Sequence, residues 1–196
     1  IGQIVDAIDN IGRESLPGSG LDSTGPMLLP PAQATSSDTL ETLIQPLAER
    51  AKATAILQGR RWQGPEAWPS WGKASSGDGS AAEIVANLLE NAFRYSPAGS
   101  PIGMTLLSDG LCIWDQGPPI PKQEQERIFE RGGRGSSSRN RPGTGLGLAL
   151  ARRLAERNGG SLTLWTEPRL IDPSLPERGN AFRLTWGPEA QPSEAR

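Results

Sequence analysis

The sequence of 196 residues contains no histidine and a single cysteine, Cys112. The lack of histidine excludes a Ser-His catalytic triad and any histidine-ligated metal centre. A single cysteine excludes an intrachain disulfide and a cysteine-rich zinc site. No apolar run approaches the roughly 18 residues of a membrane-spanning helix, and no signal-peptide pattern is present. The net charge of -2 argues against a general nucleic-acid binder. We therefore expect no nucleic-acid partner and no direct membrane contact.

Hydrophobic residues are also scarce, at 35%, whereas glycine and proline number 24 and 18. This composition predicts one modest core with long loops. Four parts are distinguished by composition: a short stretch with apolar residues at helical spacing (1–15), a linker rich in Pro, Gly and Ser (16–37), one domain (38–188) and a polar tail (189–196). Because the sequence begins with Ile1 rather than methionine, we expect it to be a piece of a longer protein.

Hydrophobic periodicity and turn signals predict the order of elements in the domain. The first helix has capping-box spacing at Asp38 and Glu41 and ends at Gly59, and the second has the same spacing at Ser80 and Glu83. After the first helix we expect a loop over 63–79 and then the second helix, over 81–95. These are followed by a hairpin over 102–107 and 111–114, a short helical piece near 122–130, a helix over 144–157, and strands over 161–166 and 181–186. This order predicts an α/β (α+β) two-layer fold with helices on one face of a mixed sheet.

Two asparagines and an arginine share one face of the helix predicted over 81–95. Asn87 and Asn91 are one turn apart, and Arg94 lies on the same side of the helical wheel. Amide oxygens can bind a metal ion, and guanidinium groups can bind a phosphate. Taken alone, this pattern is also typical of an ordinary polar helix face that is exposed to solvent.

A carboxylate follows directly after the second strand of the hairpin. Asp115 precedes Gly117 at the edge of the predicted sheet, where it could accept a hydrogen bond from a base amine. On its own, Asp115 could also be an ordinary turn residue.

A glycine-rich segment with the spacing G-x-G-x-G, over 143–147, leads into the next helix. Such loops let backbone N–H groups approach phosphate oxygens at a helix N-terminus. It is not a Walker loop, because no lysine follows the last glycine, and it does not follow a strand as a dinucleotide fingerprint does. An ordinary helix start remains an alternative. Arginines suited to phosphate contacts precede it at positions 127, 131, 134, 139 and 141.

The order of the motifs is more specific than any of them alone. The chain contains, in succession, NLLENAFRYSP (87–97), WDQGPPIP (114–121), ERIFERGGR (126–134) and GTGLGLALARRLAERNGG (143–160). This series resembles the N, G1, F and G2 boxes of the catalytic ATP-binding domain of sensor histidine kinases, in the Bergerat (GHKL) superfamily. The resemblance covers 38–188 and implies a mixed, mainly antiparallel sheet with about three helices on one face. ATP would lie between the helices and a mobile lid.

The resemblance also implies residue roles. Asn91 would ligate Mg²⁺, Asn87 would line the same phosphate channel, and Arg94 would contact phosphate. Tyr95 would pack against adenine. Asp115 would accept a hydrogen bond from the adenine amino group, with Gly117 letting the base approach. The remaining expected nucleotide-binding residues are Ile120, Arg134 in a lid over 122–142, and Gly143, Thr144, Gly145, Leu146, Gly147 and Leu148. Arg134 would reach the γ-phosphate, so Asn87, Asn91 and Arg134 form the expected catalytic set.

One substitution bears on the reaction. Relatives that hydrolyse ATP carry a glutamate where this chain has Asn87, and an amide cannot act as a general base towards water. The resemblance therefore implies γ-phosphoryl transfer to a histidine on a separate helical-hairpin domain, of which residues 1–15 would be a stub. A response regulator would receive the phosphoryl group next. The expected location is cytoplasmic, and this piece is expected to be monomeric. A degenerate binding module without transfer, an anti-sigma-type Ser kinase and an ATPase remain alternatives.

The sequence departs from the family pattern at four places. One of them is Asn158, which stands where a histidine is often found before the glycine pair at 159–160. Pro119 occupies a position that is usually glycine in the G1 box, and it stiffens the wall of the expected adenine pocket. Gly132 and Gly133 stand where an aromatic pair commonly anchors the lid, so we expect a loose lid and expect grafted aromatics to order it. The loop over 167–179 is longer than usual.

Overall fold

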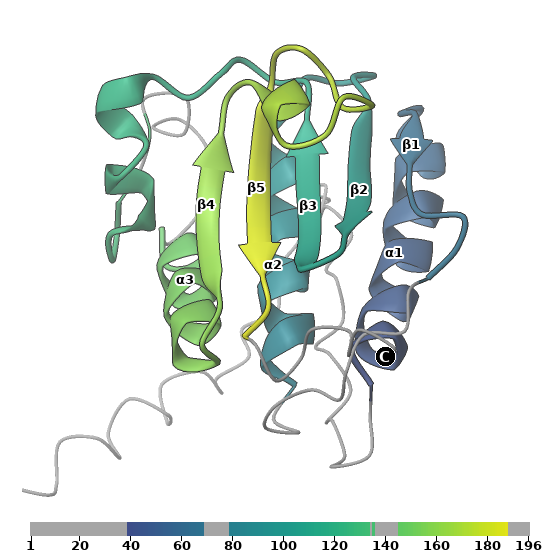
Figure 1. The fold of residues 1–196 in the computed structure, drawn as a ribbon. Helices are drawn as coiled ribbons and strands as arrows, with labels where there is room; N and C mark the ends of the chain where they lie inside the picture. Colours follow the sequence, from purple (N-terminus) through teal and green to yellow (C-terminus); the bar gives the residue numbers. More distant parts are fainter. Residues whose placement is uncertain (1–38, 69–78, 134, 136–144, 188–196) are drawn as a thin grey trace, which may run out of the picture.

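The computed structural model describes residues 39–68, 79–133, 135 and 145–187. It contains one five-stranded sheet in the order β1-β2-β3-β5-β4, with three α-helices packed on one face (Figure 1). The strands are β1 (Trp62–Gln63), β2 (Ile102–Leu107), β3 (Gly110–Asp115), β4 (Ser161–Trp165) and β5 (Asn180–Thr185). The α-helices are α1 (Leu40–Leu57), α2 (Ser80–Tyr95) and α3 (Gly147–Arg157). The predicted two-layer fold is confirmed. The predicted parts 1–15, 16–37 and 189–196 lie outside the described residues.

The sheet is mixed but mainly antiparallel. β2 and β3 form the predicted hairpin, with Ile102 opposite Asp115 and Leu107 opposite Gly110. β5 lies between β3 and β4 and is antiparallel to both, whereas the two-residue strand β1 runs parallel to β2. This register places the last residue of β3, Asp115, directly opposite the first residue of β5, Asn180.

The apolar stripe of α2 lies at the centre of the core. Ile84, Val85, Leu88 and Leu89 are buried, and α2 contacts α1, α3 and β3. Full burial of a Leu or Ile side chain contributes about 1.5 to 3 kcal/mol, so this stripe fixes α2 firmly against the sheet. The polar face of the same helix is thereby held at a fixed distance from β3.

The starts of the first two helices differ from the sequence prediction. The Thr39 side chain caps α1 and bonds reciprocally with Thr42, so the capping box predicted at Asp38 and Glu41 is wrong. Ser80 is itself the first helical residue and is buried, with Gly79 as N-cap and no side-chain cap. The predicted Ser80–Glu83 box is therefore also wrong.

Other boundaries also shift. The predicted loop at 63–79 begins inside β1, because residue 63 pairs with β2 and takes a strand conformation. Trp62 and Trp68 pack against the core. Trp71 lies outside the described residues. The piece near 122–130 is two 3₁₀ turns, η1 (Lys122–Glu124) and η2 (Arg127–Phe129).

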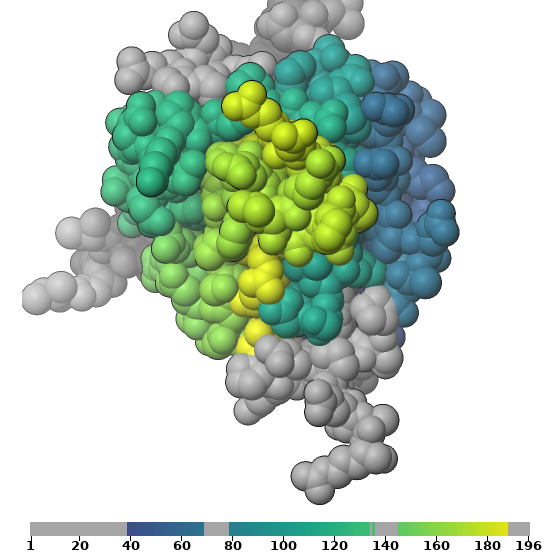
Figure 2. Space-filling model, turned by 45° about the horizontal axis from the view of Figure 1, so that its top comes forward, coloured from purple at the N-terminus to yellow at the C-terminus, as the bar shows by residue number. Residues whose placement is uncertain are grey.

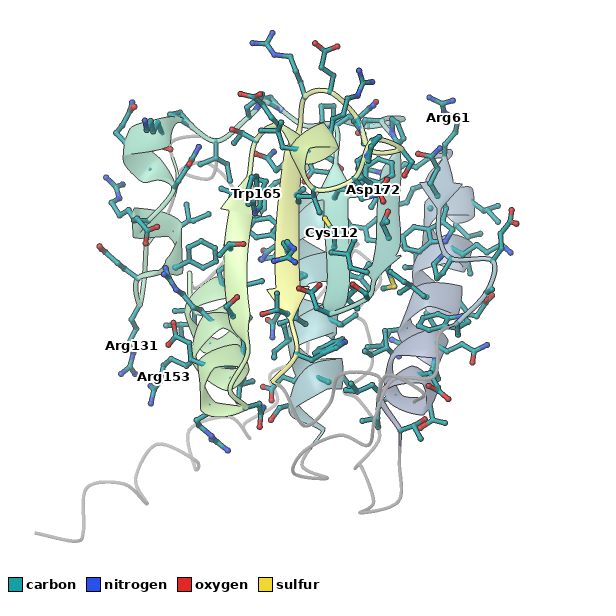
Figure 3. All side chains as sticks on the ribbon, viewed as in Figure 1. Arg61, Cys112, Arg131, Arg153, Trp165 and Asp172 are labelled. Carbon is teal, nitrogen blue, oxygen red and sulfur yellow. The ribbon has the colours of Figure 1, made fainter. Side chains whose placement is uncertain are left out.

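The long segment between β4 and β5 covers one end of the sheet face opposite the helices (Figure 1). Its short turn η4 (Pro168–Leu170) leads to Leu175, which is buried with Cys112, Trp114 and Ala181 in a second small core. Figure 2 shows the yellow-green atoms of this segment gathered over the sheet, and Figure 3 shows Asp172 near Cys112. Burial raises the pKa of the Cys112 thiol to about 12. Cys112 is therefore an unreactive packing residue.

Candidate functional site

A cavity of about 350 Å³ lies between α2, the ends of β3 and β5, and the segment leading into α3. Its walls include Asn87, Glu90, Asn91, Arg94, Tyr95, Asp115, Pro118, Ile120, Ile128, Gly133, Gly135, Gly145, Gly147, Leu148, Asn180 and Phe182. Residues more than 90 positions apart in sequence therefore meet in one pocket. Of the predicted nucleotide-binding residues, Arg134, Gly143 and Thr144 lie outside the described residues.

The polar face of α2 forms one wall of the cavity. Asn87 and Asn91 lie one helical turn apart and are both half-buried. Asn87 Nδ2 donates to the Glu83 carbonyl oxygen at 2.9 Å, which turns its amide oxygen towards Gly147. The Asn91 amide bonds to no other residue in the part of the chain that the structure describes. Asn91 lines the cavity without being engaged by any of the described side chains.

The C-terminal turn of α2 adds charge and an aromatic ring to this wall. Arg94 pairs with Glu90, one helical turn earlier, and both line the cavity together with Tyr95. The pair is partly exposed, so its contribution to stability is small, and either partner can be redirected at low cost. Arg94 thus lines the cavity, and its contact with a phosphate stays a prediction.

Asp115 is the buried acidic group of the cavity, with 4% of its surface exposed. Its Oδ1 accepts hydrogen bonds from the Gly117 N–H at 2.7 Å and from Asn180 Nδ2 at 3.3 Å. Burial raises the pKa of Asp115 to about 6, although the Gly117 N–H, the Asn180 amide and the nearby Arg60 charge each oppose this rise. The carboxylate is therefore ionised at neutral pH but close to its titration range.

Gly117 has a structural role that the sequence did not indicate. A Cβ atom at this position would lie 2.6 Å from Asp115 Oδ1. The glycine thus allows the Asp115 carboxylate to fold back onto its own turn. It lies behind Asp115 and not among the residues that line the cavity.

The glycines before α3 line the opposite side of the cavity. Gly145 has φ +69°, a conformation that favours glycine, and a Cβ on Gly147 would lie 2.8 Å from Asn87 Oδ1. Gly147 therefore lets the polar face of α2 approach the start of α3 closely. Leu148 also lines the cavity, whereas Leu146 is 42% exposed and is not among the residues that line it.

Comparison with known proteins identifies this arrangement. The family described as "Histidine kinase-, DNA gyrase B-, and HSP90-like ATPase" matches residues 78–190, more than half of the chain. The chain belongs to this ATPase family. The domain is a histidine-kinase-type ATPase catalytic domain, as the sequence motifs predicted.

The relatives of this ATPase domain are sensor kinases. It is 38% identical over 165 residues to the sensor histidine kinase Hik2 of Thermosynechococcus vestitus, covering 79% of this chain and 40% of Hik2. It is 35% identical over 113 residues to the sensor protein KdpD of Escherichia coli, covering 56% of this chain and 12% of KdpD. The chain thus spans less than half of these relatives.

Solved structures have the same fold. A structure titled "Mycobacterial sensor histidine kinase MprB" superimposes with a TM-score of 0.62 at 28% identity, covering 80% of this chain and 99% of that one. The catalytic domain of histidine kinase ThkA has a TM-score of 0.60 at 20% identity, covering 76% of this chain and 93% of that one, and it supports the fold alone.

In this ATPase domain the described part of the predicted lid, 122–133, is anchored differently from the sequence expectation. Ile128 and Phe129 are buried, and the Phe129 ring meets Phe182 edge to face at 6.2 Å between centroids. The Gly132 N–H donates to the Gly145 carbonyl oxygen at 3.2 Å. The described segment up to Gly133 is therefore fastened to the domain without the aromatic pair, and the mobility of the lid as a whole stays a prediction.

Gly133 itself has no room for a side chain. A Cβ there would lie 1.8 Å from the Arg127 carbonyl oxygen, and a Cβ on Gly145 would lie 3.0 Å from Gly132 and Gly133 backbone atoms. The expectation that grafted aromatics would order the lid is therefore wrong at Gly133, because backbone packing replaces the aromatic anchor.

The donor set of the ATPase domain fits Mg²⁺ bound together with phosphate. Within residues 39–68, 79–133, 135 and 145–187, no cluster of three or more His, Cys, Asp or Glu side chains could hold a metal. Mg²⁺ commonly keeps several waters and binds through one or two protein oxygens plus substrate phosphates. The Asn91 amide oxygen on the cavity wall can serve as such a ligand.

Sequence reasoning missed Asn180, which is buried at the base of the cavity. Its position at the start of a strand carried no motif, and only the pairing of β3 with β5 brings it to Asp115. Ile128, Phe182 and Gly133 were likewise not predicted as lining residues. No helix in the described part of the chain is long and apolar enough to cross a bilayer.

Proposed function

We propose that this domain binds Mg²⁺-ATP and transfers the γ-phosphoryl group to a histidine on a separate helical-hairpin domain. The observation that carries the proposal is the pocket itself. A buried ionised carboxylate at one end and the two-asparagine face of α2 at the other open onto the same cavity of about 350 Å³. The two ends match the base and the phosphates of a nucleotide.

The base end suits adenine. Asp115 Oδ1 is occupied by two donors, and Oδ2 accepts no hydrogen bond from any described residue. A carboxylate oxygen facing the cavity accepts a hydrogen bond from an exocyclic amino group such as that of adenine. Tyr95 and Ile120 supply apolar surface nearby for the base.

The phosphate end suits transfer better than hydrolysis. Asn91 would hold Mg²⁺ through its amide oxygen, and the ion would neutralise charge on the phosphates. Asn87 cannot take a proton from water, because an amide is not a base and its nitrogen already donates to the Glu83 carbonyl oxygen. Phosphoryl transfer depends mainly on positioning and charge, so a presented nucleophile can replace an activated water.

An exposed apolar pair beside the cavity suits docking of the acceptor domain. Leu146 and Leu150 lie one helical turn apart at the start of α3, with 42% and 41% of their surfaces exposed. Figure 3 shows Arg131 and Arg153 extending at the same corner of the molecule. Because the chain has no histidine, the acceptor must come from another domain. A response regulator would then receive the phosphoryl group, and the reaction would take place in the cytoplasm.

Calorimetry with a non-hydrolysable ATP analogue, with and without Mg²⁺, tests the binding step. We expect Mg²⁺-dependent binding that Asn91→Ala abolishes. Asn158→Ala is the matched control, since Asn158 caps the end of α3 by bonding to the Leu154 carbonyl oxygen and does not line the cavity. Unchanged affinity in Asn91→Ala would contradict the metal assignment.

The transfer step is tested by adding radiolabelled ATP and a histidine-bearing hairpin domain. Label on the histidine, lost in Asn91→Ala, supports the kinase function. Binding of nucleotide without transfer to any supplied hairpin domain would favour a nucleotide-binding module. Label on a serine of a partner would favour a serine kinase.

A further inference from the structure

Asn180 is a buried polar side chain of the cavity to which no motif assigned a role. It is 6% exposed, it begins β5, and it lies opposite Asp115 in the β3–β5 register. A buried amide is costly unless its donors and acceptor are satisfied, so its hydrogen bonds define what it does.

The polar side-chain atoms of Asn180 form their hydrogen bonds within the protein. Its Oδ1 accepts from the Ile120 N–H at 2.9 Å. Its Nδ2 donates to the Pro118 carbonyl oxygen at 3.0 Å and to Asp115 Oδ1 at 3.3 Å. A side-chain amide nitrogen has two hydrogens, so Asn180 keeps no donor for a ligand. It can therefore influence a ligand only through Asp115 and through the turn at 118–120.

The consequence for Asp115 is a fixed orientation. Two donors, the Gly117 N–H and Asn180 Nδ2, converge on Oδ1 alone. A carboxylate held by one oxygen cannot rotate without breaking both bonds, so the other oxygen, Oδ2, stays towards the cavity. The same asparagine also ties down the turn that forms the adjoining wall.

We propose that Asn180 is a positioning residue that sets the base specificity of the nucleotide pocket by aiming Asp115 Oδ2 at the ligand. This inference rests on the proposed nucleotide-binding function. A fixed anionic oxygen attracts the amino group of adenine and repels the carbonyl oxygen that guanine carries at the same ring position. Once Asn180 is removed, Asp115 can turn away, and the discrimination between the two purines falls.

Several charged or titratable groups surround Asp115. Arg60, between α1 and β1, lies close enough to favour its ionised form, and it also donates to the Phe93 and Ser96 carbonyl oxygens at the end of α2. Glu90, Arg94 and Tyr95 of α2 line the same cavity. The Asn180 amide opposes protonation of Asp115, so its loss is expected to raise the pKa of that carboxyl further.

The test compares Mg²⁺ complexes of the β,γ-imido analogues of ATP and GTP by calorimetry. In Asn180→Ala we expect ATP-analogue affinity to fall about tenfold, with little change for the GTP analogue. We also expect the pH at which ATP-analogue binding is half lost to move upward. Arg183→Ala is the matched control, because Arg183 lies on the same strand but pairs with Asp109 on the opposite sheet face.

The outcomes separate this inference from the proposed function. If the wild type binds the ATP analogue and Asn180→Ala keeps both the purine ratio and the pH midpoint, the role of Asn180 is overturned while the proposed function stands. If the wild type binds neither analogue, both are overturned. Should Asn180→Ala fail to fold, Asn180→Thr decides, since threonine suits a strand but cannot replace all three bonds. A reduced purine ratio supports the inference, and an unchanged ratio refutes it.

Discussion

The base end and the phosphate end of the cavity are built in opposite ways. At the base end, Asp115 and Asn180 are buried side chains whose positions are fixed by hydrogen bonds. At the phosphate end, glycine backbone packs against glycine backbone, and Asn91 is left without a partner among the described residues. The base end is thus specified by polar side-chain bonding. The phosphate end is specified by the close approach of backbone segments. We therefore expect added side chains to disrupt the phosphate end, and the loss of polar groups to disrupt the base end.

The largest expected effect is at the phosphate end, for Gly133→Phe. Its Cβ would lie 1.8 Å from the Arg127 carbonyl oxygen, so η2 must move. We expect a loss of more than about 2 kcal/mol in the free energy of unfolding. Gly132→Ala is the matched control, because open space surrounds its Cβ and only its φ of +76° opposes alanine, at about 1 kcal/mol. Denaturant unfolding measures both; equal losses would contradict backbone packing as the anchor.

Asp115→Asn should separate function from stability at the base end. The isosteric amide removes the charge on which the proposed adenine recognition rests, so we expect ATP affinity to fall about 10- to 100-fold. The same change removes a buried charge, and we expect the free energy of unfolding at pH 7 to rise by up to about 3 kcal/mol. Calorimetry and thermal unfolding of one preparation measure both effects. An equal fall for ATP and GTP would contradict the role of the carboxylate.

The pH dependence of the wild type provides the control for this pair of effects. The pKa of Asp115 rises from 3.8 in the unfolded chain to about 6 in the folded state, so the folded state binds the proton more tightly. The contribution of Asp115 to stability is full below pH 3.8 and is lost as the pH rises through 6. ATP affinity should follow the opposite course and weaken below pH 6. In Asp115→Asn both dependences should disappear from this pH range.

Gly147→Ala should produce a smaller effect, confined to the phosphate end. The new Cβ would lie 2.8 Å from Asn87 Oδ1 and would displace that side chain. Because the Asn87 amide is half-buried at the cavity wall, we expect Mg²⁺-ATP affinity to fall about tenfold with little change in unfolding. The double variant Asn87→Ala/Gly147→Ala should lose no more affinity than Asn87→Ala alone. Additive losses would mean that Gly147 acts independently of Asn87.

Arg152→Ala is expected to have the smallest effect. Arg152 lies over the Phe129 ring at 4.8 Å from its centroid and pairs with Glu126 at 3.0 Å, so it fastens α3 to the lid base. Both contacts are partly exposed, and their loss should cost about 0.5 to 1 kcal/mol. Hydrogen exchange should accelerate over 126–133 and remain unchanged at Asp115. Arg153→Ala, an exposed neighbour on the same helix, is the control.

The motifs predicted much of the site but little of its internal support. Asn87, Asn91, Arg94, Tyr95 and Asp115 could be assigned from local spacing and order, and the structure brings all five to one cavity. Their supports could not be assigned. Asn180 reaches Asp115 only through strand pairing across 65 positions. Gly132 and Gly133 seemed to weaken the lid, because the sequence does not show that Gly145 packs against them.

The sequence by itself determined the family, the order of the elements and the chemical groups at both ends of the cavity. These features depend on local periodicity and on motifs that follow one another along the chain. The tertiary structure alone decided which Asp115 oxygen is held by two donors, which side chains a Cβ at Gly117 or Gly147 would displace, and what anchors the base of the lid. The physical reason is that hydrogen-bond saturation and close packing depend on distances between segments far apart in sequence, and periodicity carries no information on such distances.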